Sequence, residues 1–144
     1  MTSNENAQRV PTADELAPQV TATTMMSAAV VVLDLDRALE FYVTVLGMID
    51  TGTRVDLPEF VEAPVAFPGG GAFVMLMQYK EEAPPATRSI GNRLVLLVPD
   101  LASVAERLRA AGREFSTDIN ATGSGSLVAV LEDPDGNCYE LVQR

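Results

Sequence analysis

Histidine is absent from this sequence of 144 residues. It is the commonest metal ligand and the usual acid or base near neutral pH. Its absence therefore excludes imidazole-bound metals and nucleophiles activated by a Ser-His-Asp or Cys-His arrangement. A phosphate-binding glycine motif is also missing, because Gly69, Gly70 and Gly71 precede a predicted strand, whereas a phosphate loop leads into a helix.

Cysteine, basic residues and long apolar runs are scarce. Cys138 is the only cysteine, so no intrachain disulfide can form. Ten Lys and Arg against twenty Asp and Glu give a net charge of -10, which argues against nucleic acid or an anionic membrane surface as a partner. No run approaches the roughly 20 apolar residues that span a bilayer, and residues 1–24 lack a signal-peptide pattern. We therefore expect a cytoplasmic protein.

Hydrophobic residues nevertheless make up 47% of the chain, which is ample for the core of one domain. Residues 1–23 have no apolar period and predict a flexible N-terminal arm. The apolar run at 25–33 predicts a buried strand. Apolar residues then recur at helical spacing, and they predict a helix that Asp34 or Asp36 caps and Gly47 ends. Three further strands are predicted at residues 48–55, 61–67 and 72–79.

The same series begins again after a predicted linker at residues 80–89. Residues 93–98 predict a strand, and Asp100 caps a second helix that ends at Gly112. Three further strands are predicted at residues 113–117, 126–131 and 137–143.

The two series share one register, apart from a single residue lost in the second helix, and this identifies an internal repeat. Asp34 and Asp100 are 66 residues apart, and Gly71 and Gly136 are 65 apart. The sequence therefore predicts an α+β fold made of two βαβββ modules, at residues 24–79 and 90–144.

This arrangement resembles the vicinal oxygen chelate superfamily, which includes glyoxalase I, fosfomycin and bleomycin resistance proteins and extradiol dioxygenases. The resemblance rests on residues 34–42 with 46–48, on 98–101, and on the Asp-Pro-Asp-Gly-Asn motif at 133–137 with Glu140 and Leu141. It implies that the mixed sheets of the two modules curl into a cup. It also implies a homodimer, with each cup formed either within one chain or across two.

The resemblance places four metal-ligand positions on the first and fourth strands of each module: Ser27, Met75, Arg93 and Glu140. Only Glu140 is a common metal ligand, and Arg93 would repel a cation, so we expect neither a bound metal nor any other cofactor. Arg93 and Glu140 are instead expected to face each other across the cup as a buried ion pair. The pair either only fills the former metal site or also contacts a ligand.

Strand alternation predicts an apolar inner face around this pair, as in a small-molecule pocket. The predicted ligand-binding residues are Ser27, Ala29, Phe73, Met75, Met77, Arg93, Val95, Cys138 and Glu140. Met75 and Met77 are either adaptable walls or ordinary core, and Cys138 is interpreted as a small buried hydrophobe. Phe41 and Tyr42 are assigned to packing.

Three functions are compatible with these residues. The first is metal-independent binding of a small apolar or aromatic organic molecule, similar to that of bleomycin-resistance proteins. The second is a metal-free lyase, isomerase or cyclase that uses Glu140 as general base and Arg93 as anion stabiliser. The third is an accessory domain whose cup is vestigial.

Overall fold

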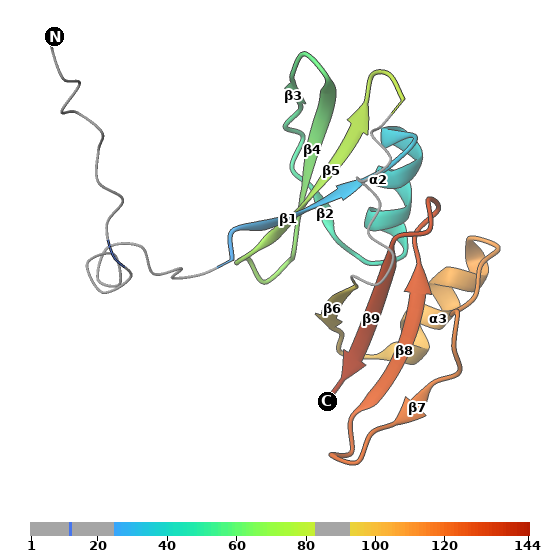
Figure 1. Cartoon of the computed structure of the whole chain (residues 1–144). Helices are drawn as coiled ribbons and strands as arrows, with labels where there is room; N and C mark the ends of the chain where they lie inside the picture. The colour runs from blue at the N-terminus through green and yellow to red at the C-terminus, as the bar shows by residue number, and fades with distance from the viewer. Residues whose placement is uncertain (1–11, 13–24, 83–92) are drawn as a thin grey trace, which may run out of the picture.

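The computed structural model describes residues 12, 25–82 and 93–144. The predicted arm and most of the predicted linker lie outside the described residues, so these boundaries and the module limits stay predictions. Two mixed β-sheets, each with one helix, follow one another along the chain (Figure 1). The predicted α+β fold with two repeats is confirmed.

Each half begins with a strand and a helix, which are followed by four strands in the first half and by three in the second. The first half contains β1 (Ser27–Val31), α2 (Leu35–Thr44), β2 (Ile49–Asp50), β3 (Val55–Asp56), β4 (Phe60–Ala66) and β5 (Phe73–Tyr79). The second half contains β6 (Leu94–Leu97), α3 (Leu101–Ala110), β7 (Asn120–Ala121), β8 (Leu127–Glu132) and β9 (Cys138–Gln143). The strand orders are β1-β5-β4-β2, with β3 beside β4, and β6-β9-β8-β7. In each half the first and last strands pair in parallel.

An aspartate caps the start of each helix, as predicted. Asp34 Oδ1 accepts a hydrogen bond from the N–H of Arg37 at 2.9 Å. Asp100 Oδ1 accepts from the N–H of Ala102 at 3.1 Å, and its Oδ2 accepts from the Ser103 hydroxyl at 2.6 Å. The Ser103 and Ala102 hydrogen bonds lower the pKa of the Asp100 carboxyl, because they stabilise its charged form.

A glutamine of the last strand ties each helix to its own sheet. Gln78 Oε1 accepts from the N–H of Leu35 at 2.6 Å, and Gln143 Oε1 accepts from the N–H of Leu101 at 2.7 Å. Both glutamines occupy the same repeat position. The contact satisfies one of the backbone donors that a helix leaves unpaired at its start.

The core lies between each helix and its sheet. Val74 and Leu76 of β5 are buried beneath α2, and Tyr139 and Leu141 of β9 are fully buried in the second half. Side chains at alternating positions face the other way, so Glu140 is only half-buried. The predicted alternation along both last strands is confirmed.

One predicted strand is interrupted. The segment 48–55 contains only the two-residue strand β2 and the first residue of β3, because the chain turns between them. Gly52 has φ 76°, and its N–H donates to Asp50 Oδ1 at 2.9 Å. Such an aspartate turn competes with the strand ladder.

The predicted strand at 113–117 is wrong. Ser116 donates one backbone hydrogen bond to the carbonyl of Val130 at 2.7 Å, but the return bond goes from the N–H of Val130 to the Thr117 hydroxyl at 3.0 Å. A side chain therefore replaces the backbone acceptor, and the ladder does not continue. The short strand β7 pairs with β8 instead.

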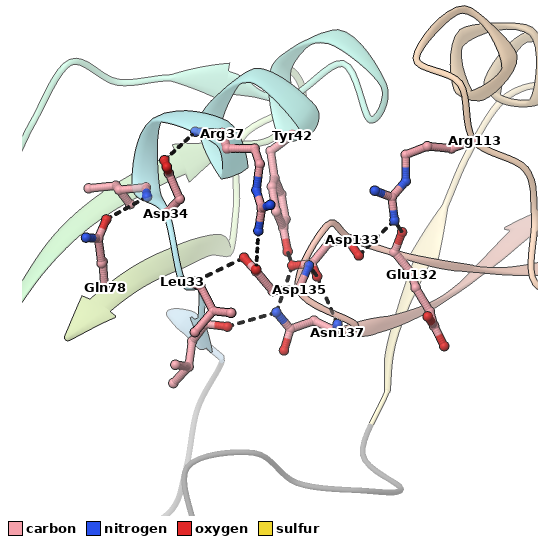
Figure 2. Close-up of polar contacts among 12 residues, drawn as sticks. Leu33, Asp34, Arg37, Tyr42, Gln78, Arg113, Glu132, Asp133, Asp135 and Asn137 are labelled. Carbon is pink, nitrogen blue, oxygen red and sulfur yellow. Dashed lines mark hydrogen bonds and ion pairs between the residues drawn. The ribbon is translucent and has the colours of Figure 1, made fainter. Parts of the chain in front are cut away.

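The two halves meet where the turn between β8 and β9 reaches the end of β1 and the start of α2 (Figure 2). Asp135 accepts from the N–H of Leu33 at 3.0 Å and from the Arg37 guanidinium at 2.5 Å. Asn137 Nδ2 donates to the carbonyl of Val31 at 2.9 Å. These contacts bridge about one hundred residues of sequence.

Asp133 is the centre of this junction and is 1% exposed. Its Oδ1 accepts from the N–H groups of Asp135 and Asn137, both at 2.9 Å. Its Oδ2 accepts from the Tyr42 hydroxyl at 2.8 Å and from Asn137 Nδ2 at 2.7 Å. These four hydrogen bonds replace the hydration that the carboxylate loses on burial.

Tyr42 has a polar role besides the packing role assigned to it. Its hydroxyl lies 2.7 Å from that of Tyr139, and the two rings meet edge to face at 5.8 Å between centroids. Burial first, and then the neighbouring Tyr139 and Asp133, raise the pKa of Tyr42 well above its ordinary value. Tyr42 therefore stays protonated and donates to Asp133.

Replacing Asp133 by Ala should destabilise the protein strongly. The change leaves a buried tyrosine hydroxyl and two backbone N–H groups without their acceptor, which costs roughly 3–5 kcal/mol by analogy with broken buried polar pairs. Urea unfolding followed by circular dichroism measures the effect.

Asp118→Ala is the matched control, because Asp118 is exposed and should change stability by less than about 0.5 kcal/mol. If both variants lower the free energy of unfolding equally, Asp133 does not hold the two halves together.

Candidate functional site

The turn between β4 and β5 is the repeat equivalent of the turn that holds Asp133. At the same 65-residue offset, Pro68 replaces Asp133 and Gly70 replaces Asp135. This turn approaches β6 of the second half, as the lower end of β4 and β5 in Figure 1 shows. The glycines provide no side chain to bridge the two halves here.

The opposing positions have lost their polar groups as well. Pro99 stands where the first half has Leu33, and proline has no N–H to donate. Leu108 stands where the first half has Tyr42, and it is fully buried. Among the residues that the structure describes, the hydrogen-bonded junction on one side of the molecule therefore has no counterpart on the other.

A cavity of about 650 Å³ occupies this second junction. Its described lining is almost entirely apolar: Met25, Ala28, Phe67, Gly69, Gly70, Ala72, Phe73, Val74, Arg93, Leu94, Val95, Leu96 and Leu97. Small-molecule sites commonly have volumes of 300–1,000 Å³ and this type of lining. We call it the junction cavity.

Glycine shapes the edge of the junction cavity. The N–H of Gly70 donates to the carbonyl of Phe67 at 2.9 Å and closes the turn. Gly70 has φ 77°, a conformation that other residues rarely adopt. A Cβ at Gly69 or Gly70 would meet no atom within 4 Å, so open space lies beside the turn.

Arg93 and Glu140 are adjacent in one sheet, which corrects the prediction of a buried pair facing across a cup. Glu140 pairs with Val95 on the neighbouring strand, and Arg93 precedes β6. Arg93 Nη1 lies 3.4 Å from Glu140 Oε2, with the two side chains 49% and 31% exposed. A long, partly solvated contact of this kind contributes only about 0–1 kcal/mol.

Residues 24–141 match the sequence model of the Glyoxalase/Bleomycin resistance protein/Dioxygenase superfamily. The chain belongs to this superfamily. The lactoylglutathione lyase GLX1 of Arabidopsis thaliana is 33% identical over 116 residues, which cover 77% of this chain but only 41% of that protein. The lactoylglutathione lyase of Salmonella typhimurium is 30% identical over 117 residues, 76% of this chain and 84% of that protein.

Solved structures of the superfamily share the fold. A superfamily member from Sphaerobacter thermophilus is 26% identical, with a TM-score of 0.69 over 85% of this chain and 98% of that chain. TnmS3, an antibiotic binding protein from Streptomyces sp. CB03234, has a TM-score of 0.67 over 86% of this chain and 98% of that chain. TnmS3 is 22% identical, so this likeness concerns the fold alone.

The sequence-predicted site residues fall into two groups, one on each sheet. Ser27, Ala29, Phe73, Met75 and Met77 lie on β1 and β5, where Ser27 pairs with Phe73 and Ala29 with Met75. Arg93, Val95, Cys138 and Glu140 lie on or next to β6 and β9. Phe73, Arg93 and Val95 line the junction cavity, whereas the other six do not belong to its described lining.

Sequence reasoning missed most of the lining because it selected one face of each strand. The cavity lies at the ends and edges of strands, where successive residues such as Leu94 and Leu96 contribute together with Val95 and Leu97. The available signal was the break in the repeat at residues 68–71, where glycines replace the polar motif of the second half.

The residues at the positions to which the resemblance assigns metal ligands do not form a usual donor set for a divalent metal. A hydroxyl, a thioether, a guanidinium and a single carboxylate stand at Ser27, Met75, Arg93 and Glu140. Divalent metals need several converging imidazole, thiolate or carboxylate donors. Within residues 25–82 and 93–144, moreover, no three Cys, Asp or Glu side chains form a cluster that could hold a metal ion.

Among the described residues, no helix is long and apolar enough to cross a membrane.

Protein purified without chelator should carry far less than one equivalent of Zn, Ni, Mn or Fe, because its donor set is too poor to retain them. Inductively coupled plasma mass spectrometry measures the content, with carbonic anhydrase, a zinc enzyme, carried through the same steps. A stoichiometric metal would contradict this prediction.

Proposed function

We propose that the protein binds a small apolar or aromatic organic molecule without the help of a metal. The observation that carries the proposal is the junction cavity of about 650 Å³, whose described lining has a single charged residue, Arg93. Such a lining removes apolar ligand surface from water, which contributes roughly 25 cal/mol per Å² before the costs of association.

The position of the cavity also supports binding. It lies between the two halves, where the repeat has lost the polar contacts that close the opposite junction. The antibiotic binding protein TnmS3 has the same fold, which supports the idea that this scaffold can present a small-molecule site.

A metal-free lyase is the second candidate, because relatives that are 30–33% identical are named lactoylglutathione lyases. In that function Glu140 would remove a proton from the substrate and Arg93 would stabilise the resulting anion. The geometry favours this less, since Glu140 does not belong to the described lining of the cavity and its side chain is engaged with Arg93.

The proposed assembly is a homodimer. Val95 and Leu97 are 59% and 66% exposed on β6 and also line the junction cavity, so a second copy packed against them would help to enclose a bound ligand. Size-exclusion chromatography with light scattering should give twice the chain mass of 15.4 kDa. A monomer mass at micromolar concentration would refute the dimer.

Gly69→Leu should weaken ligand binding, because Gly69 lines the junction cavity and a leucine there would occupy part of its volume. The leucine enters open space and φ at Gly69 is not positive, so the fold should be unchanged. A library of neutral aromatic compounds, screened by thermal shift, should contain ligands that stabilise the native chain and lose at least about tenfold in affinity with Gly69→Leu.

Gly123→Leu is the matched control, because Gly123 also has no atom within 4 Å of a Cβ but lies outside the cavity. Equal loss with both variants, or no stabilising compound at all, would contradict the proposal. Consumption of a bound compound would favour the lyase instead, and Glu140→Gln should then stop the reaction without preventing binding.

A further inference from the structure

The junction cavity combines an apolar lining with a single charged group. Arg93 is the single charged residue among its described lining, and ten of the thirteen lining residues are apolar in side chain, the other two being glycines. No carboxylate belongs to that lining. A ligand that fills the cavity therefore meets apolar surface throughout and one guanidinium at the start of β6.

The described contacts of Arg93 leave most of its hydrogen-bonding capacity unused. A guanidinium has five N–H donors, yet Arg93 makes only one hydrogen bond to Glu140, from Nη1 to Oε2 at 3.4 Å. The Arg93 side chain is 49% exposed. It can therefore turn toward a second carboxylate, for which its two parallel donors are well matched.

The net charge of -10 does not oppose this contact strongly. Charges more than about 8 Å away are largely screened at physiological ionic strength. The nearby competitor is Glu140 on the neighbouring strand, whose carboxylate already contacts Arg93. When a ligand carboxylate binds Arg93, it takes the place of the Glu140 carboxylate.

We infer that the ligand of the junction cavity is an apolar or aromatic molecule that bears a carboxylate, and that Arg93 selects it by binding this carboxylate. This inference rests on the proposed binding function and adds the class of ligand. Glu140 acts against it by holding the guanidinium when no ligand is bound. The two residues therefore have opposite effects on the affinity for an anion.

The test compares two fluorescent compounds that share a pyrene body, 1-pyrenebutyrate and the neutral 1-pyrenebutanol. The native chain should bind the carboxylate about tenfold more tightly than the alcohol at 0.15 M salt. Arg93→Met should remove that preference, so that the two compounds bind with similar affinity. Glu140→Gln should tighten binding of the carboxylate by about threefold, because the competing acceptor loses its charge.

Arg109→Met is the control for net charge, since Arg109 lies on α3 outside the cavity lining and should change neither affinity. If the native chain binds both compounds with equal affinity, and if Gly69→Leu but not Arg93→Met lowers that affinity, the ligand class is wrong while the binding function stands. If neither compound binds the native chain, both the ligand class and the proposed function are overturned. The inference is supported if Arg93→Met lowers and Glu140→Gln raises the affinity for 1-pyrenebutyrate, but not the affinity for 1-pyrenebutanol.

Discussion

The buried carboxylate of Asp133 is the interaction on which the placement of the two halves depends. A charged group that is 1% exposed is tolerable only when donors surround it, and these come from both halves of the chain. The turn between β8 and β9 supplies its own N–H groups and Asn137, while α2 supplies the hydroxyl of Tyr42. The turn and the helix must therefore assemble together, which fixes one junction between the repeats in a single geometry.

The second junction shows what happens when the same fold is built without such a group. Pro68 and Gly70 replace the two aspartates, and the facing Pro99 has no N–H that would need an acceptor. Both sides of the contact have changed together, so no buried polar atom is left without a partner among the described side chains. What remains is an apolar hollow with Arg93 at its edge. The asymmetry of the repeat thus gives one junction a network of hydrogen bonds and the other an apolar cavity.

The fold follows from the sequence because its signals are local and repeated. Helix caps, glycine turns and apolar alternation each occur twice along the chain, and the two caps are confirmed at Asp34 and Asp100. The site is less predictable, because it depends on how strand ends from two halves approach each other. The resemblance placed Arg93 and Glu140 at converging positions, yet it could not show that they are neighbours within one sheet and partly exposed. The strand predicted at 113–117 failed for a related reason, since a single hydroxyl of Thr117 replaces the backbone acceptor.

A crystal structure of the protein with 1-pyrenebutyrate would locate the ligand. The pyrene should lie between the turn that follows β4 and strand β6, with a carboxylate oxygen within hydrogen-bonding distance of Arg93. Density for the compound on another surface, with the junction cavity containing only water, would contradict this placement.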